Sequence, residues 1–409
     1  MTEQMNVPKL RFGEFEGEWN RNIFNDISVI TRLAGYEYST YWEEDPKQEI
    51  IALRGYNIGS NKLLLRDLGY ISDKLSKQLS RSRLAKGDIV YPCVGTIGNS
   101  TVIDEDDKYH IQQNIAKITC NEKTSPYYVS QFLSSFWGMR EVYKFNATSS
   151  QPNVLVGSLR NFKISLPKLP EQQKIASFLS KADEKIGLLS EKKDKLTEYK
   201  RGVMQQLFNG KWHDQDGQLT FTPPTLRFKA DDGSEFPDWE EKKLGEVFSI
   251  SAGGDIDKKH SNKVRTDKFR YPIFANAETN KGLYGYSDVY KVDQPCITVS
   301  GRGSLGNAVY RNEAFYPIVR LLVLKPQFAL NLKFFEQTIN KLNIYNESTG
   351  VPQLTAPQLK TYRVLFPSTN EQDKIASFLT LLEQKIGLVN SELETAKEWK
   401  KGLLQQMFV

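Results

Sequence analysis

Two long stretches of the chain, residues 170–208 and 370–408, carry apolar side chains at alternating steps of four and three residues. These steps average 3.5 residues, which is the heptad seam of a helix that pairs with another helix. The seam positions of the first stretch are Ile175, Leu179, Ala182, Ile186, Leu189, Lys193, Leu196, Lys200, Val203 and Leu207. Those of the second are Ile375, Leu379, Leu382, Ile386, Val389, Leu393, Ala396, Lys400, Leu403 and Met407. Each stretch predicts a helix of about 39 residues, roughly 58 Å long at 1.5 Å per residue.

A helix of this length with a single apolar stripe needs a partner that covers the stripe. The other stretch is the simplest partner, so we predict an intramolecular two-helix coiled coil. The alternative is that each helix packs along its own globular domain. The strict period, which extends over more than four heptads, favours the coiled coil.

The two predicted helices belong to a longer internal repeat. Residues 146–208 align with residues 346–408 at a constant offset of 200 without a gap, and both copies contain KIASFL followed by KIGL. The segment PKLRF at residues 8–12 likewise matches PTLRF at residues 224–228. The chain is therefore predicted to consist of two half-molecules related by duplication.

Between these shared segments the chain contains short apolar and β-branched runs, such as EIIALRGYNI and PCITVSGRGS, bounded by Gly, Asn and Asp. This pattern is typical of strands separated by turns, and it predicts two β-rich domains with a few helices in an α+β fold. We expect the first globular domain at residues 1–166, including a framework segment at 1–17, and the second at 238–366. The helical segments are expected at 167–237, which includes a linker, and at 367–409.

Composition and charge exclude fewer possible functions than the repeat does. The net charge of +6 and the pI of about 8.8 only weakly favour a polyanionic partner for a chain of 409 residues. Cys93, Cys120 and Cys296 have no CxxC spacing and indicate neither a disulfide framework nor a zinc site. The N-terminus lacks the apolar core of a signal peptide, and the longest apolar run, at 318–330, is interrupted by charges and Pro326. We therefore expect a soluble, cytoplasmic protein that does not associate with membranes.

The segment GRGSLG at residues 301–306 matches the GxGxxG pattern of a dinucleotide-binding turn. Such a turn must lead into a helix whose N-terminus faces the pyrophosphate, whereas the next residues, NAVYRN, resemble a strand. A tight β-turn is the preferred interpretation. The segment GTIGN at residues 95–99 is its counterpart in the first half of the chain.

Other catalytic patterns are weak or absent from the sequence. The residues around Pro237 superficially resemble a PD…ExK nuclease motif, but the acidic residues lie too close together for a metal site between two strands. There is no Walker A segment, no HExxH and no [ND]PP[YF] segment of an adenine methyltransferase, and His110, His213 and His260 have no ligand spacing. The sequence favours binding over catalysis, although its polar turn residues suit any solvated loop as well as phosphate and base contacts.

The order of the segments resembles that of the specificity subunits of type I restriction-modification systems. A variable domain, a PKLPEQQKIASFL helix, a second variable domain and an EQDKIASFL helix follow one another over essentially the whole chain. The resemblance implies two target-recognition domains that each read one half of a bipartite double-stranded DNA site, and an antiparallel coiled coil that sets the gap between the half-sites and docks two methyltransferase subunits. It also implies a non-catalytic chain without its own cofactor. S-adenosylmethionine, ATP and Mg would then serve the partner methyltransferase and restriction subunits.

The resemblance directs attention to polar residues in the predicted loops and helices. Arg54 and Arg302 lie beside glycines, where the backbone can approach DNA closely and an arginine can reach a guanine or a phosphate. The candidate DNA-binding residues are Arg54, Tyr56, Thr148, Ser149, Gln151, Ser300, Arg302, Ser348 and Thr349. A second set of polar residues repeats between the two helices and is predicted to contact a partner or another domain of the chain, although these residues equally suit solvated helix faces. These candidate partner-binding residues are Glu171, Gln172, Lys174, Gln205, Gln206, Glu371, Gln372, Lys374, Gln405 and Gln406.

Because the two domains differ in sequence, we predict two different half-sites. Residues 209–236 follow the first helix, whereas the second helix has no such segment after it in this sequence. We expect residues 1–17 to take the equivalent place beside the end of the second helix, which would bring the two chain ends together. Two alternative functions remain: a DNA methyltransferase or nuclease that acts alone, and a coiled-coil scaffold whose β-rich domains bind another ligand.

Overall fold

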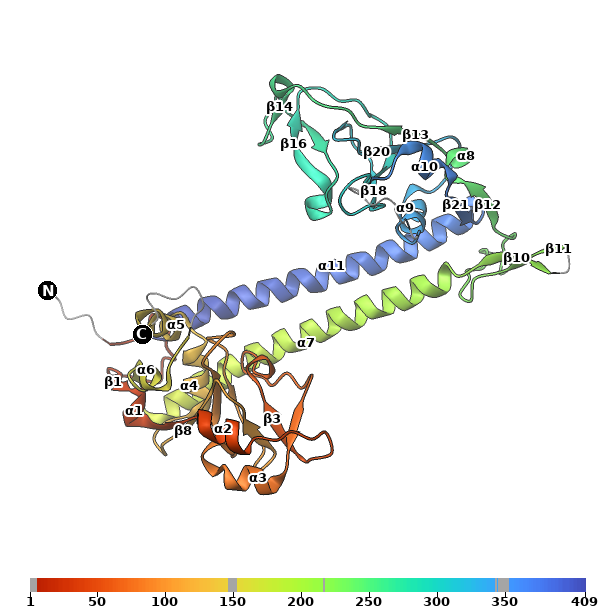
Figure 1. Ribbon diagram of the computed structural model, residues 1–409. Helices are drawn as coiled ribbons and strands as arrows, with labels where there is room; N and C mark the ends of the chain where they lie inside the picture. The colour runs from red at the N-terminus through yellow and green to blue at the C-terminus, as the bar shows by residue number, and fades with distance from the viewer. Residues whose placement is uncertain (1–5, 146–152, 216–217, 343, 345–352) are drawn as a thin grey trace. The chain divides into compact units, whose positions relative to one another are not determined.

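A computed structural model of the protein describes residues 6–145, 153–215, 218–342, 344 and 353–409. The chain divides into two compact units, which we call unit 1 (residues 1–192 and 389–409) and unit 2 (residues 193–388). Two long helices, α7 (Leu169–Leu207) and α11 (Thr369–Gln406), each contribute one part to unit 1 and one part to unit 2 (Figure 1).

The globular part of unit 1 contains two small β-sheets. An antiparallel sheet has the strand order β2-β8-β5-β6, and a second sheet has the order β4-β3-β7, in which β3 and β7 are parallel. The strands are β2 (Ser28–Thr31), β3 (Ile50–Leu53), β4 (Gly69–Ile71), β5 (Ile89–Pro92), β6 (Thr101–Val102), β7 (Tyr109–Ile111) and β8 (Ile115–Cys120). The helices are α1 (Phe24–Ile27), α2 (Gly35–Tyr41), α3 (Asp73–Gln78), α4 (Pro126–Leu133), α5 (Phe136–Phe145) and α6 (Val156–Arg160). Every residue of β3 and β5 is buried, which explains their continuous apolar sequences.

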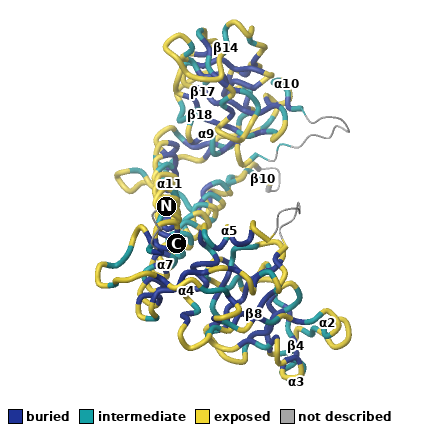
Figure 2. The backbone as a smooth tube through the Cα atoms, turned by 90° about the vertical axis from the view of Figure 1, so that its left-hand side faces the viewer, coloured by how far each residue is buried: buried dark blue, intermediate teal, exposed yellow. Residues whose placement is uncertain are grey.

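Unit 2 repeats this arrangement with different sequences. Its antiparallel sheet has the order β13-β20-β17-β18, and its second sheet has the order β14-β16-β15-β19, in which β15 and β19 are parallel. The strands are β13 (Phe248–Ala252), β14 (Ser261–Asn262), β15 (Tyr271–Phe274), β16 (Leu283–Ser287), β17 (Cys296–Val299), β18 (Ala308–Arg311), β19 (Tyr316–Pro317) and β20 (Leu322–Pro326). The helices are α8 (Leu244–Val247), α9 (Leu332–Asn340) and α10 (Ala356–Thr361). The strands β17 and β18 form part of a buried interior (Figure 2).

In each unit a two-stranded sheet joins the start of the globular domain to its end. β1 (Asn20–Ile23) pairs antiparallel with β9 (Lys163–Leu166), and β12 (Glu240–Lys243) pairs in the same way with β21 (Arg363–Phe366). The helices α7 and α11 begin shortly after β9 and β21. The linker between α7 and β12 contains a hairpin, β10 (Lys211–Gln215) and β11 (Gln218–Thr222).

The two long helices run antiparallel in each unit. In unit 1, Ile175 near the start of α7 lies in one hydrophobic cluster with Leu403 near the end of α11. In unit 2, Leu207 near the end of α7 clusters with Ile375 near the start of α11. All twenty seam positions predicted from the heptads are buried or half-buried. The predicted coiled coil is confirmed, although the ends of the helices also pack into the cores of the globular domains, as the alternative proposed.

The segment around Leu10 occupies in unit 1 the place that the segment around Leu226 occupies in unit 2. The backbone N–H of Leu10 donates to the carbonyl of Gln406 over 2.9 Å, and that of Leu226 donates to the carbonyl of Gln206 over 3.3 Å. The following arginines, Arg11 and Arg227, form ion pairs with Glu171 (2.7 Å) and Glu371 (3.0 Å) respectively. These matching contacts support the expectation that the first residues of the chain extend the framework of the second helix.

Candidate nucleic-acid interface

The segment at residues 301–306 forms a tight turn between the antiparallel strands β17 and β18. The N–H of Gly306 donates to the carbonyl of Ser300 over 2.9 Å, and Gly303 and Gly306 adopt positive φ angles of 68° and 82°. No helix follows the turn, because the chain continues directly into β18. The prediction of a β-turn is confirmed, and a dinucleotide-binding turn is excluded because it requires a helix N-terminus at the pyrophosphate.

Unit 1 contains the same turn between β5 and β6. Gly95 and Gly98 have positive φ angles of 81° and 92°, as Gly303 and Gly306 do in unit 2. A Cβ atom at Gly98 would lie 2.7 Å from Sδ of Met139, and one at Gly306 would lie 2.8 Å from Cδ1 of Ile344. The backbone conformation and the close neighbours both require glycine at these positions.

Arg302 occupies the turn of unit 2 at the position of Val94 in unit 1. The internal repeat confirms the correspondence, because Arg302 forms a backbone bridge with Gln353, and Val94 forms one with Asn153, the repeat counterpart of Gln353. Arg302 is partly exposed, and within the described residues its guanidinium has no hydrogen bond or ion pair. This side chain is therefore available to a ligand.

Ser300, by contrast, is only 3% exposed. Its hydroxyl donates to the carbonyl of Ser304 and accepts from the N–H of Asn307 over 3.0 Å. The hydroxyl thus donates one hydrogen bond and accepts another within the turn itself. We leave Ser300 out of the interface because a ligand cannot reach this hydroxyl without disrupting the turn.

Arg320, which is exposed, also lies beside this turn, and the sequence pattern did not point to it. Val319 and Arg320 adopt φ angles of 53° and 59°, a left-handed conformation that is costly for residues other than glycine. The side-chain amide of Asn276 donates to the carbonyl of Val319 and accepts from the N–H of Gly301 over 2.7 Å, which ties the strained pair to the turn. Strained backbone of this kind is concentrated at functional sites. The sequence gave no sign of this strain, because it showed Arg320 only as a charge within an apolar run.

Arg311 shows how a structural arginine in the same unit differs from Arg302 and Arg320. It is 6% exposed, its guanidinium lies 3.6 Å from the ring centroid of Phe274, and it donates to the hydroxyl of Thr298 over 3.0 Å. Burial lowers the pKa of Arg311 to about 10. This arginine therefore stabilises the packing between the sheets of unit 2.

The candidates Arg54 and Tyr56 of unit 1 lie in the loop after β3, next to the turn at Gly95–Gly98. The hydroxyl of Thr96 in that turn donates to the carbonyl of Gly55 over 3.2 Å. However, the guanidinium of Arg54 is bound to the carboxylate of Glu44 over 2.6 Å and to the hydroxyl of Tyr56 over 2.9 Å. Arg54 thus positions Tyr56, which is 41% exposed, and its own charge is neutralised.

The remaining five DNA-binding candidates lie outside the described residues. They are Thr148, Ser149, Gln151, Ser348 and Thr349. The described chain resumes at Asn153 and Gln353, which form backbone bridges with Val94 and Arg302 of the two turns.

Four of the partner-binding candidates are buried and engaged within the chain. Glu171 and Glu371 are 2% and 0% exposed and bind the arginines of the framework segments. Gln172 accepts from the N–H of Ser125 over 2.8 Å, and Gln372 accepts from the N–H of Asn331 over 2.9 Å, so each glutamine binds the residue that caps α4 or α9. These four side chains join each helix to its globular domain, and we do not include them in a partner surface.

The other partner-binding candidates are more accessible. Lys174 and Lys374 reach the solvent but form ion pairs with Glu14 and Asp231. The four glutamines at the helix ends are exposed: Gln205, Gln206, Gln405 and Gln406. They can therefore contact another protein.

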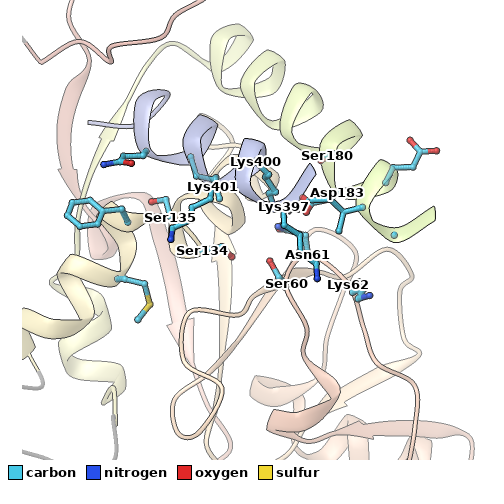
Figure 3. Close-up of a pocket in the computed structure, with 17 residues that line it drawn as sticks. Ser60, Asn61, Lys62, Ser134, Ser135, Ser180, Asp183, Lys397, Lys400 and Lys401 are labelled. Atoms are coloured by element: carbon cyan, nitrogen blue, oxygen red, sulfur yellow. Dashed lines mark hydrogen bonds and ion pairs between the residues drawn. The ribbon is translucent and has the colours of Figure 1, made fainter. Parts of the chain in front are cut away.

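Beside the helices, unit 1 contains a pocket of about 1020 Å³ lined by residues from α7, α11 and the globular domain (Figure 3). At its wall Lys400 forms an ion pair with Asp183, whose carboxylate also accepts from the amides of Asn61 (3.2 Å) and Gln131 (2.8 Å). The cluster connects both helices to the loop before β4 and to α4. It is therefore a polar clamp between the helix pair and the first globular domain.

Unit 2 contains the counterpart of this clamp. Lys200 forms an ion pair with Glu383 over 2.6 Å, and Gln337 donates to the same carboxylate over 3.1 Å. Lys200 and Glu383 occupy the repeat positions of Lys400 and Asp183. The adjoining pocket is smaller, about 410 Å³, and contains Glu336, whose pKa is raised by burial.

The described residues contain neither a cluster of metal ligands nor a helix that could span a membrane. No group of three or more His, Cys, Asp and Glu side chains is placed to hold a metal ion. In the same part of the chain, no helix has the length and apolar character needed to cross a bilayer.

The family model for the "Type I restriction modification DNA specificity domain" matches residues 46–198 and 237–398. The chain belongs to this family. A putative type I restriction enzyme specificity subunit of Methanocaldococcus jannaschii is 24% identical over 98% of this chain and 95% of its own length. A putative type I specificity subunit of Mycoplasma pneumoniae is 26% identical over 61% of this chain, and the match spans 63% of that relative.

The fold also matches that of a solved member. The crystal structure of a type I restriction-modification S subunit from M. genitalium aligns with a TM-score of 0.64 and 15% identity, over 98% of this chain and 99% of that one. The family resemblance found in the sequence is thus confirmed. The chain is a DNA-binding type I specificity subunit with two target-recognition domains. In this specificity subunit the repeated turns, with Arg302 and Arg320 in unit 2, are the strongest candidates for contact with DNA.

Proposed function

We propose that this specificity subunit reads an asymmetric bipartite site in double-stranded DNA, with one half-site for each unit. The observation that carries the proposal is the pair of equivalent turns, which present Val94 in unit 1 and Arg302 in unit 2. An arginine can donate two hydrogen bonds to a guanine, whereas a valine can offer only apolar contact, for instance to a thymine methyl group. Equivalent positions with such different side chains select different bases.

The rigidity of the turn in unit 2 supports a role in base reading. The packing of Gly306 against Ile344 and the hydrogen bonds of Asn276 fix the backbone that carries Arg302 and Arg320. A site that is held in place before binding loses less conformational freedom when the ligand arrives. In unit 1, Arg54 likewise positions Tyr56, which lies beside the equivalent turn.

We further propose that two methyltransferase subunits dock on the repeated exposed faces of the helices. Leu188 and Leu388 are 60% and 65% exposed, and Tyr199 and Trp399, which also occupy equivalent repeat positions, are 54% and 50% exposed. Repeated exposed apolar side chains and repeated exposed glutamines on the same helices suit two copies of one partner. Adenine methylation with S-adenosylmethionine, and translocation and cleavage with ATP and Mg, would belong to partner methyltransferase and restriction subunits in the cytoplasm, and the chain itself would be non-catalytic.

The test is to co-express the chain with a methyltransferase subunit of its own system and to map adenine methylation across the host genome. We expect a split motif of two unlike halves with a fixed gap. Arg302→Ala should relax base selection in one half only, by about 5- to 150-fold, which corresponds to roughly 1–3 kcal/mol for a bidentate contact.

Arg363→Ala is the matched control, because Arg363 is 59% exposed on β21 and bound to Glu241. It should leave both halves unchanged. Equal relaxation of both halves by Arg302→Ala would contradict modular reading. An assembled complex that produces no new methylation would favour the scaffold alternative.

A further inference from the structure

The segment Lys258–Arg270 of unit 2 is strongly basic. It contains six lysine and arginine residues and a single acidic residue, Asp267. The six cations are Lys258, Lys259, Lys263, Arg265, Lys268 and Arg270, and all are exposed. The segment contains the edge strand β14, and most of its residues are exposed (Figure 2).

Little of this positive charge is neutralised by the protein. Lys259 forms an ion pair of 3.3 Å with Asp257. Within the described residues, the other five cations form no ion pair. Unpaired cations on one surface repel one another, and together they attract a polyanion.

Tyrosine rings orient two of the cations on the second sheet of unit 2. The Nζ atom of Lys263 lies 3.8 Å from the ring centroid of Tyr284. The guanidinium of Arg270 lies 4.9 Å from the ring centroid of Tyr271 and donates to its hydroxyl over 2.8 Å. These contacts limit the motion of long side chains before any ligand binds, which reduces the entropy lost on binding.

Unit 1 has no basic segment at the equivalent place, residues 32–49. Between β13 and β15, residues 253–270 of unit 2 contain six lysine and arginine residues against three aspartates. Between the equivalent strands β2 and β3, residues 32–49 of unit 1 contain two basic residues against five acidic ones. The duplicated domains therefore carry opposite charge at corresponding positions.

We propose that Lys258–Arg270 is a phosphate-binding segment that gives the second target-recognition domain a sequence-independent hold on the DNA backbone, and that the first domain has no equivalent. The inference rests on the proposed function, since it assumes that DNA reaches unit 2. DNA presents one negative charge about every 1.7 Å along its axis, so a run of exposed cations can contact several phosphates and release their counterions. Such contacts position the duplex, while Arg302 and Arg320 would read the bases.

The experiment measures the salt dependence of DNA binding by the complex with methyltransferase subunits. Affinity for a duplex with the methylated motif and for a scrambled duplex is determined between 50 and 200 mM salt by fluorescence anisotropy. The test variant combines Lys258→Gln, Lys263→Gln and Arg265→Gln. The matched control combines Lys229→Gln, Lys243→Gln and Lys360→Gln, which are exposed lysines of unit 2 outside the segment.

Each lost phosphate contact lowers the slope of log K against log salt by about 0.9, so the test variant should lose about 2.7 from its slope. Over a fourfold change in salt, the wild type should then lose about 40-fold more affinity than the variant does. The weakening should be equal for both duplexes, because phosphate contacts carry no sequence information. The control, and a variant with Lys258→Arg, Lys263→Arg and Arg265→Lys, should retain the wild-type slope.

An unchanged slope in the test variant, or a loss confined to the motif duplex, would overturn the inference. The same slope change in the control would overturn it as well, since the effect would then reflect total charge. These outcomes are separate from a failure of the proposed function. In that case the wild-type complex would not prefer the motif duplex, whereas the slope on the scrambled duplex would still report on the segment.

Discussion

Replacing Lys400 by methionine tests how the first globular domain is held to the helices. Lys400 and Asp183 have side chains that are 8% and 21% exposed, so the ion pair lies largely out of water. In the variant the Asp183 carboxylate would keep only the amide donors of Asn61 and Gln131. The repeat supplies a matched control, Lys200→Met, because the pair of Lys200 and Glu383 is 22% and 45% exposed.

The difference in burial sets the expected magnitudes. Removing one partner from a fully buried pair destabilises a protein by about 3–5 kcal/mol, whereas exposed pairs contribute about 0–1 kcal/mol. Because Asp183 keeps two amide donors and some contact with water, we expect Lys400→Met to lower the free energy of unfolding of unit 1 by about 2–3 kcal/mol. Lys200→Met should lower that of unit 2 by about 0.5 kcal/mol. For domains of this size, these values correspond to falls in Tm of roughly 4–12 °C and 1–2 °C.

Scanning calorimetry of the purified chain and its variants provides the measurement. Adding Asp183→Asn to Lys400→Met should recover part of the lost stability, because the uncompensated carboxylate is removed. Equal falls in Tm for Lys400→Met and Lys200→Met would refute the reasoning from burial. No recovery in the double variant would show that the loss comes from packing of the lysine stem.

Four further predictions follow from the described contacts. Gly303→Ala should destabilise unit 2 by roughly 1–2 kcal/mol because of the positive φ, and Gly306→Ala should destabilise it by more, because only Gly306 also faces Ile344. Denaturant unfolding measures both losses, and equal losses would contradict the packing argument. Burial raises the pKa of the three free cysteine thiols to between about 11 and about 12, so Ellman's reagent at pH 8 should modify them only after unfolding. Burial lowers the pKa of His110 below its usual 6.5, so below pH 6.5 the unfolded state binds a proton that the folded state does not. The free energy of unfolding should therefore fall by up to about 1.4 kcal/mol for each pH unit below pH 6.5. His110→Gln should flatten this dependence. Inserting one heptad in both long helices should lengthen the gap between the methylated half-sites without changing their bases, and an unchanged gap would exclude the helices as the spacer.

Sequence reasoning worked where the information is local. The heptad positions predicted α7 and α11 to within a few residues, and all of them are buried or half-buried. The turn at Gly301–Gly306 was also predicted, since the glycines and the strand-like residues on either side lie next to one another in the chain. A helix period or a β-turn needs only a short window of sequence.

The same reasoning left open which of the repeated polar positions contact a partner and which contact another part of the chain. Glu171 and Gln172 repeat as Glu371 and Gln372, as a docking surface would, yet they are buried. The partner of Glu171 is Arg11, which is 160 residues away in the chain. A helical pattern gives the face on which a residue lies, but it does not show that a distant arginine covers and neutralises it.

The sequence by itself determined that this protein has two long helices, two β-rich domains and an internal repeat, because periodicity, turn residues and duplication are properties of neighbouring residues and of self-similarity. Only the tertiary structure decided which polar side chains remain free. It neutralised Arg54 with Glu44, left Arg302 unpaired among the described residues and placed the strained Arg320 beside it. Each of these outcomes depends on contacts between segments that are distant in sequence, and such contacts form only when the strands and loops pack together.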